Sequence, residues 1–425
     1  MASDTPKVEF TPSLIDVDTD AYDAQLAAKR RLVEEQFAEF NPPKLEVFQS
    51  KPKNYRMRSE FTVWHEKEET YYQMYEKDNE TGESKRVRVD SFPVASELIN
   101  ELMPRVMEAV QGNIVLRKKL FQANFHTTLA GNSMVTLIYH RKLEDDWKEA
   151  AKVLREELSK LPGIANPPHI IGRSRKQKIF LDINEVEEVL DVPGRGTLRY
   201  IQVEGAFSQP NAGICTCMLG WAVDVTQGGT SKNHDLLELY CGNGNFTAAL
   251  APNFRRVVAT EISKSSVAAA KRNFEANKVE NVFVARMSSE EFTQAWQTGK
   301  KFNRLEGINL KEYDFKTLLV DPPRAGLDDE TIKVVRDFER VVYISCNPAT
   351  LKRDVESVSD LFTVERFAMF DQFPYTHHVE CGVYLVRRAD APPVVPPAPL
   401  EEEQEEDAQV EPESKKQKID DEPQP

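Results

Sequence analysis

The chain has 425 residues and 40% of them are hydrophobic, so it can form two folded domains with tails. Its net charge of −14 lies mostly in residues 390–425, which carry −9, so the charge does not exclude a nucleic-acid partner. No run of about 18 uncharged apolar residues occurs, and the five cysteines form no CxxC pairs, which argues against membrane spans, disulfide frameworks and metal sites.

The first half of the chain mixes helix and strand patterns. Helical periodicity is present in residues 22–40, 96–112 and 144–161. Strand patterns occupy residues 55–65, 71–75, 86–89 and 127–139. The last of these is broken at Gly131-Asn132, a turn dipeptide that indicates a hairpin. We therefore predict a flexible N-terminus over residues 1–20 and an α+β domain with an antiparallel sheet over residues 21–200.

The pattern changes near residue 213, where strands and helices begin to alternate. A helix-like stretch at 217–225 comes first, and 265–275 is another. Short apolar strands are expected at 236–240, 257–260, 282–284, 318–320 and 341–345. Such alternation is typical of a doubly wound parallel sheet, which we predict for residues 201–389.

The end of the chain departs from this alternation. Two strands, 363–370 and 382–387, have no helix between them and should form an antiparallel edge of the sheet. Residues 390–425 are rich in proline and then in acid, and we expect them to be disordered.

A cofactor signature lies in residues 235–246, where a strand runs into a glycine-containing turn and then a helix. Glycines let a ligand approach the backbone, and the helix N-terminus offers free N–H groups. Glu261, 21 residues after Tyr240, ends the next strand and can accept hydrogen bonds from ribose hydroxyls. Thr247 stands where a dinucleotide site needs its third glycine, which disfavours NAD but leaves it open on this segment alone.

Three chemical groups follow or precede strands at what should be one edge of the sheet. Asp321 follows one strand, Cys346 follows the next, and Glu380 comes just before the last. A thiolate that adds to carbon 6 of uracil makes carbon 5 nucleophilic, and a base must then remove the carbon 5 proton. A strand-end cysteine is nevertheless more often an inert buried residue. A metal at His377, His378 and Glu380 is disfavoured, because neighbouring side chains of an extended segment point to opposite faces.

Longer motifs help to choose between a catalytic and an inert cysteine. They belong to a resemblance to a known family that runs from Tyr22 to Arg387. The motifs are Tyr55-Arg56-Met57-Arg58, residues 88–93 (RVDSFP), Ser208-Gln209-Pro210-Asn211 and Asp371-Gln372-Phe373-Pro374. With the segments above, they resemble the RNA 5-methyluridine methyltransferase family, in its tRNA (uracil-5-)-methyltransferase branch of bacterial TrmA type. The iron–sulfur cysteines and TRAM domain of the related ribosomal-RNA branch have no counterpart here, which favours tRNA.

The resemblance implies a function and a set of roles. The expected reaction transfers methyl from S-adenosylmethionine to carbon 5 of the T-loop uridine at tRNA position 54, through a covalent adduct between the cysteine and carbon 6. It implies a class I, Rossmann-like C-terminal domain, with Cys346 as the nucleophile and Glu380 as the proton acceptor. The residues that match the family's cofactor positions are Gln209, Tyr240, Asn245, Glu261 and Asp321.

RNA contacts are expected from four basic islands between Lys51 and Lys178 that are interleaved with aromatic residues. The target base must leave its loop, so a stacking wedge is needed. The candidate RNA-binding residues are Phe121, His140, Arg324, Arg56 and Arg58.

Two other classes of protein share some of these sequence features. The alternatives are a non-catalytic tRNA-binding protein, disfavoured by the presence of both Cys346 and Glu380, and an NAD-linked oxidoreductase. We expect a monomer with no metal and no membrane partner. A cytoplasmic location is expected, and the patch Lys415-Lys416-Gln417-Lys418 keeps nuclear import as an alternative.

Overall fold

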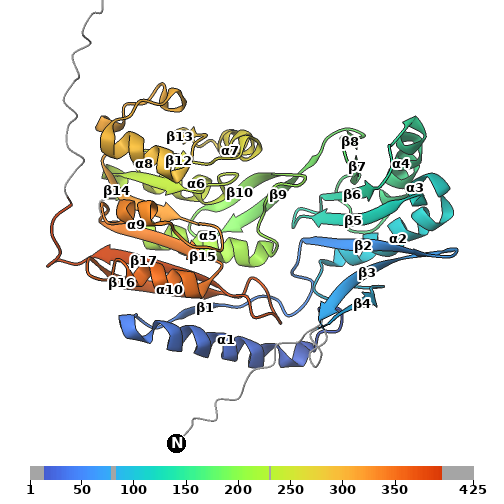
Figure 1. The fold of residues 1–425 in the computed structure, drawn as a ribbon, viewed down its shortest axis with the longest axis horizontal. Helices are drawn as coiled ribbons and strands as arrows, with labels where there is room; N and C mark the ends of the chain where they lie inside the picture. The colour runs from blue at the N-terminus through green and yellow to red at the C-terminus, as the bar shows by residue number, and fades with distance from the viewer. Residues whose placement is uncertain (1–13, 78–82, 229–230, 395–425) are drawn as a thin grey trace, which may run out of the picture.

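The computed structural model describes residues 14–77, 83–228 and 231–394. Two bodies are visible in Figure 1, each built on its own sheet. The larger body holds an eight-stranded sheet and the smaller body a seven-stranded sheet, counted over these described residues. The expected disorder of the N-terminus and of the acidic tail, and the Lys415–Lys418 patch, fall largely or wholly outside the described residues.

The sheet of the larger body has the strand order β1-β16-β17-β15-β14-β11-β12-β13. Its strands are β1 (Glu46–Phe48), β11 (Asp235–Leu239), β12 (Val257–Thr260), β13 (Val282–Ala285), β14 (Phe315–Val320), β15 (Arg340–Ser345), β16 (Phe362–Phe370) and β17 (Glu380–Arg387). Strands β11 to β15 pair in parallel, and their side chains are almost all buried, as expected when both faces of a sheet are covered. The predicted doubly wound sheet is confirmed.

Helices cover both faces of this sheet. On one face lie α5 (Ala212–Thr226), α6 (Asn245–Leu250) and α7 (Lys264–Ala276), which share one core with the strands. The second core, on the other face, contains α1 (Tyr22–Phe37), α8 (Ser289–Thr298), α9 (Asp329–Val335) and α10 (Pro348–Glu356). Figure 1 shows α1 running along α10 and the C-terminal strands, so the two ends of the folded chain lie side by side.

The edge of the larger sheet differs from the sequence-based prediction. Strands β16 and β17 are antiparallel, as expected, but β1 pairs in parallel with β16 and forms the outermost strand. A three-residue strand has too short an alternation pattern to be found in the sequence. The N-terminal segment therefore covers an edge that the C-terminal strands leave open.

The smaller body has the strand order β4-β3-β2-β5-β6-β7-β8. Its strands are β2 (Arg58–Glu66), β3 (Glu69–Lys77), β4 (Ser84–Arg88), β5 (Leu120–Thr127), β6 (Ser133–Tyr139), β7 (His169–Ser174) and β8 (Gln177–Phe180). The predicted hairpin exists between β5 and β6, but its first strand ends at Thr127 rather than beginning there. All pairs are antiparallel except β6 with β7, which are joined by a helical crossover.

Three helices belong to the smaller body: α2 (Glu97–Gly112), α3 (Ile114–Arg117) and α4 (Asp145–Leu158). They share one core with the inward side chains of the sheet, including the fully buried Trp147. The helices predicted at 96–112 and 144–161 are confirmed here, and the one predicted at 22–40 is α1 of the larger body, with ends that shift by a few residues.

A long hairpin, β9 (Glu185–Val192) and β10 (Gly196–Val203), joins the two bodies and was not predicted. On one side, the backbone N–H of Ile201 donates to Asn273 of α7 at 2.7 Å. On the other, the buried carboxyl of Glu188 accepts from the N–H of Leu129, in the β5–β6 turn, at 2.8 Å. The hairpin thereby fixes the smaller body against the larger one.

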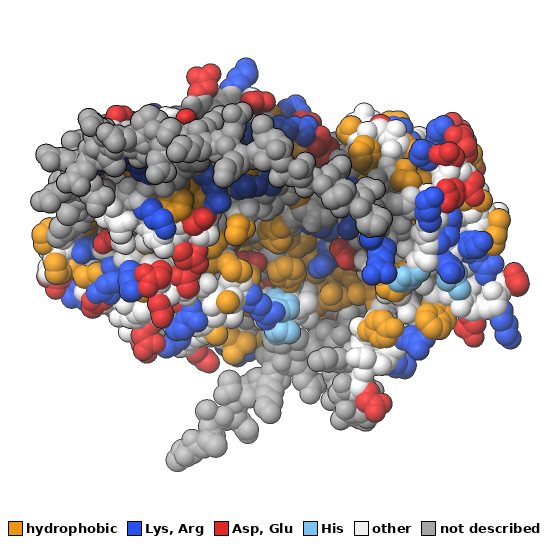
Figure 2. Space-filling model, turned by 45° about the horizontal axis from the view of Figure 1, so that its top comes forward, with side chains coloured by type: hydrophobic (Ala, Val, Ile, Leu, Met, Phe, Trp, Pro, Cys, Tyr) orange, Lys and Arg blue, Asp and Glu red, His pale blue; other side chains and the backbone are white. Residues whose placement is uncertain are grey.

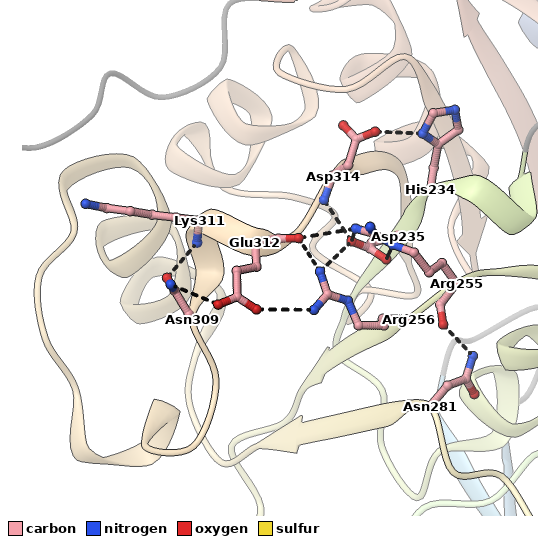
Figure 3. A network of polar contacts seen from close by, with 9 residues as sticks. All are labelled: His234, Asp235, Arg255, Arg256, Asn281, Asn309, Lys311, Glu312 and Asp314. Atoms are coloured by element: carbon pink, nitrogen blue, oxygen red, sulfur yellow. Dashed lines mark hydrogen bonds and ion pairs between the residues drawn. The ribbon is translucent and has the colours of Figure 1, made fainter.

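A polar network anchors the end of the larger sheet where β11 begins (Figure 3). Asp235 is fully buried and accepts from Arg255 Nε at 2.9 Å and from the N–H of Asp314 at 2.7 Å. Arg256 reaches the same carboxylate at 3.4 Å and stacks on the Tyr313 ring. Since the ligand edge of such a sheet lies at the carboxyl ends of the strands, this network serves as scaffold.

Candidate active site

Strand register brings the predicted catalytic groups to one edge of the larger sheet. Ser345 of β15 pairs with Cys381 of β17, so Cys346 and Glu380 occupy the next opposed positions. Val320 pairs with both Leu239 and Tyr343, so Asp321 and Tyr240 follow on the neighbouring strands at the same edge. The structure therefore gathers Tyr240, Asp321, Cys346 and Glu380 around the carboxyl ends of the central strands.

Burial raises the pKa values of the acidic groups at this edge. Burial raises the pKa of Glu380 to about 8, and the charge of Asp321 contributes. The pKa of Asp321 rises to about 7 because of burial. The half-buried Cys346 thiol has its pKa raised to about 11, first by burial and then by the charges of Glu380 and Asp321, while Arg324 lowers it. The site is thus poised to exchange protons near neutral pH and favours a cationic ligand.

The loop that follows Asp321 is fastened to α10. Asn347 caps α10 through the N–H of Ala349 and donates from Nδ2 to the Arg324 carbonyl at 3.0 Å. Asp354 of α10 accepts from the N–H of Leu327 at 2.9 Å. Arg324 has an exposed side chain at this edge, close enough to Cys346 for its charge to lower the pKa of the thiol.

The glycine turn after β11 has the backbone that a ligand cradle needs. Gly244 has φ +77°, and a Cβ there would lie 2.6 Å from the Phe274 ring, so only glycine fits. Glu261 accepts from the N–H of Gly242 at 3.0 Å and of Ser263 at 2.7 Å, which ties the turn to the end of β12. Tyr240 has φ +63°, an uncommon conformation for a residue with a side chain.

Other polar groups surround this turn. Asn245 begins α6 and donates to the Cys215 sulfur at 3.2 Å. Glu238 of β11 is buried, its Oε2 has no partner among the described residues, and burial raises its pKa to about 8. Buried and strand-end carboxyls beside this turn fit a ligand that carries both a cationic group and ribose hydroxyls.

A third segment reaches the site from between the two bodies. Residues 204–211 link β10 to α5, and within them Gln209 accepts from the Nε2 of Gln372 at 2.6 Å. Phe207, two residues earlier, is 73% exposed. Sequence reasoning missed Phe207, Gln372 and Glu238, although each lies within or beside a motif that carried the family resemblance.

The predicted RNA-binding residues fall into separate groups. Phe121 lies in β5 and His140 directly follows the neighbouring β6, and their rings meet edge to face at 4.4 Å. Phe121 is 40% exposed, which suits a stacking surface. Arg58 instead donates to the Ala206 carbonyl at 2.8 Å and to Ser208, and Arg56 donates to the Arg58 carbonyl.

Some cations of the basic islands have acidic partners, whereas others are free to meet phosphate. Arg173 and Lys178 both pair with Glu204, at 3.1 and 2.7 Å. Lys118 and Lys119 have exposed side chains just before β5. Figure 2 shows hydrophobic side chains gathered between the two bodies, with Lys, Arg and His side chains around them.

One argument about the histidines was wrong. The rings of His377 and His378 lie 4.1 Å apart, rather than on opposite faces, because the segment before β17 turns instead of running straight. In the described part of the chain, no group of three His, Cys, Asp or Glu side chains is placed to hold a metal ion. Nor does any helix in that part have the length and apolar character needed to cross a membrane.

Comparison with known proteins gives the family. A model of the tRNA (uracil-5-)-methyltransferase family matches residues 21–388. A tRNA/tmRNA (uracil-C(5))-methyltransferase of Acinetobacter baylyi is 52% identical over 86% of this chain and 98% of its own. A relative of the same name from Chromohalobacter salexigens is 54% identical over 88% of this chain and 98% of its own.

Among solved structures, the chain resembles a tRNA (uracil-54, C5)-methyltransferase of Pyrococcus abyssi in complex with S-adenosyl-L-homocysteine. The TM-score is 0.62 at 22% identity, over 86% of this chain and 83% of that one, so this likeness supports the fold.

The fold and the cradle define an S-adenosylmethionine-dependent methyltransferase with a Rossmann-like sheet. The chain belongs to the tRNA (uracil-5-)-methyltransferase family. It is therefore an enzyme that methylates carbon 5 of uracil in tRNA, with S-adenosylmethionine as the methyl donor.

Proposed function

We propose that the enzyme methylates uridine 54 in the T-loop of tRNA through a covalent adduct between Cys346 and carbon 6 of the base. The observation that carries this proposal is the opposed placement of Cys346 and Glu380 where β15 and β17 separate. A nucleophile and a base side by side are what substitution at carbon 5 of a neutral pyrimidine requires.

The reaction divides between these two side chains. The Cys346 thiol gives its proton to solvent, and the thiolate adds to carbon 6, which places electron density on carbon 5. S-adenosylmethionine, when bound, supplies an electrophilic methyl group that carbon 5 takes. Glu380 then accepts the carbon 5 proton, the carbon–sulfur bond breaks and the Cys346 thiolate leaves. A cation near Asp321 and Glu380 would lower the pKa values of both carboxyls and favour their charged forms.

The residues near the glycine turn are proposed to hold the methyl donor. Glu261 faces the ribose, since its carboxylate already ends β12 beside the turn. Tyr240 and Asn245 flank the glycine turn, Asp321 follows the neighbouring strand β14, and Gln209 lies in the linking loop.

The smaller body, with the linking loop, is proposed to bind RNA. Phe121 and His140 form a stacking pair, while Arg324 lies at the catalytic edge, where a base that has left its loop must arrive. The exposed ring of Phe207 is a further candidate for stacking. Since the relatives are named for both tRNA and tmRNA, we propose a T-loop in either RNA as the substrate.

The test measures 5-methyluridine in transcribed tRNA by nucleoside mass spectrometry. We expect Cys346→Ala to abolish product while it retains S-adenosylmethionine binding, and Glu380→Gln to accumulate a protein–RNA adduct that survives a denaturing gel. Cys217→Ala, which removes another half-buried thiol on α5, should behave like the native enzyme. Turnover by Cys346→Ala, or methylation at a uridine outside the T-loop, would contradict the proposal.

A further inference from the structure

A hydrogen bond between two side-chain amides connects the linking loop, residues 204–211, to the catalytic edge of the sheet. The Nε2 of Gln372 donates to the Oε1 of Gln209 at 2.6 Å, across 163 residues of sequence. Gln372 is fully buried just after β16, whereas Gln209 is half-buried in the loop between β10 and α5. Gln209 thus depends on a rigid neighbour for the orientation of its amide.

Gln372 is held by the scaffold around it. Its N–H donates to the Phe370 carbonyl at 2.8 Å, and Phe370 pairs with Glu380 across β16 and β17. The preceding residue, Asp371, forms a fully buried ion pair with Lys29 at 2.7 Å and accepts from Gln25 at 3.1 Å. Through these contacts, α1 fixes the segment from which the Gln372 amide extends.

The pairing decides which amide atom Gln209 can offer to a ligand. Gln372 takes one lone pair of the Gln209 Oε1 and fixes the plane of that amide, so that both N–H donors of Nε2 remain for a ligand. The Oε1 of Gln372 is buried without a partner among the described residues. The reverse arrangement would bury an unpaired NH2 group there, and native proteins tolerate unpaired donors less well than unpaired carbonyls.

We infer that Gln372 is a positioning residue that turns Gln209 into a fixed hydrogen-bond donor, so that the ligand atom it meets must be an accepting oxygen. This inference rests on the proposed function, in which Gln209 faces the site. The oxygen belongs either to the carboxylate of S-adenosylmethionine or to a carbonyl of the uracil. In the second case a fixed donor also rejects cytosine, because the 4-amino group of cytosine is itself a donor.

The first test is a double-mutant cycle between Gln209→Ala and Gln372→Met. Gln372→Met keeps the length of the side chain and removes its donor. We expect the affinity for the ligand that Gln209 contacts to fall two- to tenfold, which corresponds to about one hydrogen bond. If Gln372 acts only through Gln209, the double variant is no worse than Gln209→Ala alone. Losses that multiply would mean that Gln372 is merely structural, and would overturn the inference.

Gln25→Met is the matched control for this cycle. It removes contacts to Asp371 and to the N–H of Tyr375 in the same segment but does not touch Gln209. Its effect should appear in thermal stability and should multiply with that of Gln209→Ala. Coupling of Gln25 to Gln209 as strong as that of Gln372 would also overturn the inference.

The second test reverses the polarity at Gln209. In Gln209→Glu, Gln372 donates to one carboxylate oxygen and the other repels an accepting ligand, so this variant should lose more than Gln209→Ala. If it binds as well as the native enzyme, the ligand atom is a donor and the inference fails.

Two readouts identify the ligand and keep the inference separate from the proposed function. Calorimetry measures S-adenosylmethionine affinity without turnover, and this affinity falls in the Gln209 and Gln372 variants if the accepting oxygen belongs to the cofactor. The KM for tRNA and the discrimination against a cytidine-54 tRNA respond if it belongs to the base. Native enzyme that leaves uridine 54 unmethylated refutes the proposed function, whereas active enzyme with multiplying losses refutes only the inference.

Discussion

The buried ion pair between Lys29 and Asp371 makes the stability of the larger body depend on α1, and Lys29→Met tests that dependence. Both side chains are fully buried, 342 residues apart, with Nζ and Oδ1 at 2.7 Å. Lys29 also donates to the Phe373 carbonyl at 2.8 Å. Methionine fills a similar volume and supplies neither donor, so the substitution isolates the loss of charge and hydrogen bonds.

The magnitude follows from what the substitution leaves behind. Breaking a buried pair by removal of one partner costs about 3–5 kcal/mol, because the other charge stays buried without compensation. Asp371 would retain the Gln25 amide on its second oxygen at 3.1 Å, so we expect the lower end of that range, about 3 kcal/mol. Urea denaturation followed by far-UV circular dichroism measures it.

Two controls make the measurement decisive. Lys29→Met combined with Asp371→Leu removes both charges and should recover most of the loss, since an apolar replacement of a buried pair is often neutral. Lys352→Met removes a partly exposed pair with Glu39, and should cost less than about 1 kcal/mol. A loss below about 1 kcal/mol for Lys29→Met alone would refute the argument that this pair is desolvated in the folded enzyme.

Three further outcomes are expected at the site and the RNA surface. Glu261→Ala should weaken S-adenosylmethionine binding by about 1–3 kcal/mol in calorimetry, because charged hydrogen bonds to the ribose are lost; an unchanged affinity would move the ribose elsewhere. The single-turnover rate should rise with pH up to about 8, because burial raises the pKa of Glu380 to about 8, the bound cationic methyl donor moves it down from that value, and only the deprotonated form accepts a proton; a rate that falls as the pH approaches 8 would contradict that role. Neutralising Lys118 and Lys119 should flatten the salt dependence of tRNA affinity by about one unit per lost phosphate contact, and an unaltered slope in a salt titration would remove them from the interface.

Much of the larger sheet could be predicted because its strands are short apolar runs between turns. Residues 257–260 were placed without error, and every central strand was found to within a few residues. The hairpin of β9 and β10 was missed because the charged Glu188 holds a buried position of β9 and Val189 an outward one, which interrupts the apolar alternation. Strand β1 depends on a partner some 320 residues away and has no local signal.

The candidate site divides in the same way. Asp321 and Cys346 could be placed together because neighbouring parallel strands end at one edge, and the antiparallel β17 brings Glu380 back to it. The pair of Gln209 and Gln372 could not, since hydrogen bonds between distant loops follow from tertiary packing and not from spacing. The histidine argument failed because it assumed an extended backbone where the chain turns.

The parallel pairing of β1 with β16 has a consequence for the order in which the enzyme can be assembled. During synthesis, β1 emerges early but has no partner until residues 362–370 leave the ribosome. Until then its apolar neighbours, including the Phe37 side chain of α1, lack the core they complete. In a nascent chain, α1 and β1 therefore stay without their packing partners until β16 has been made. A truncated chain that ends before β16 would expose their apolar side chains and the unpaired edge of β1 to chaperones and proteases.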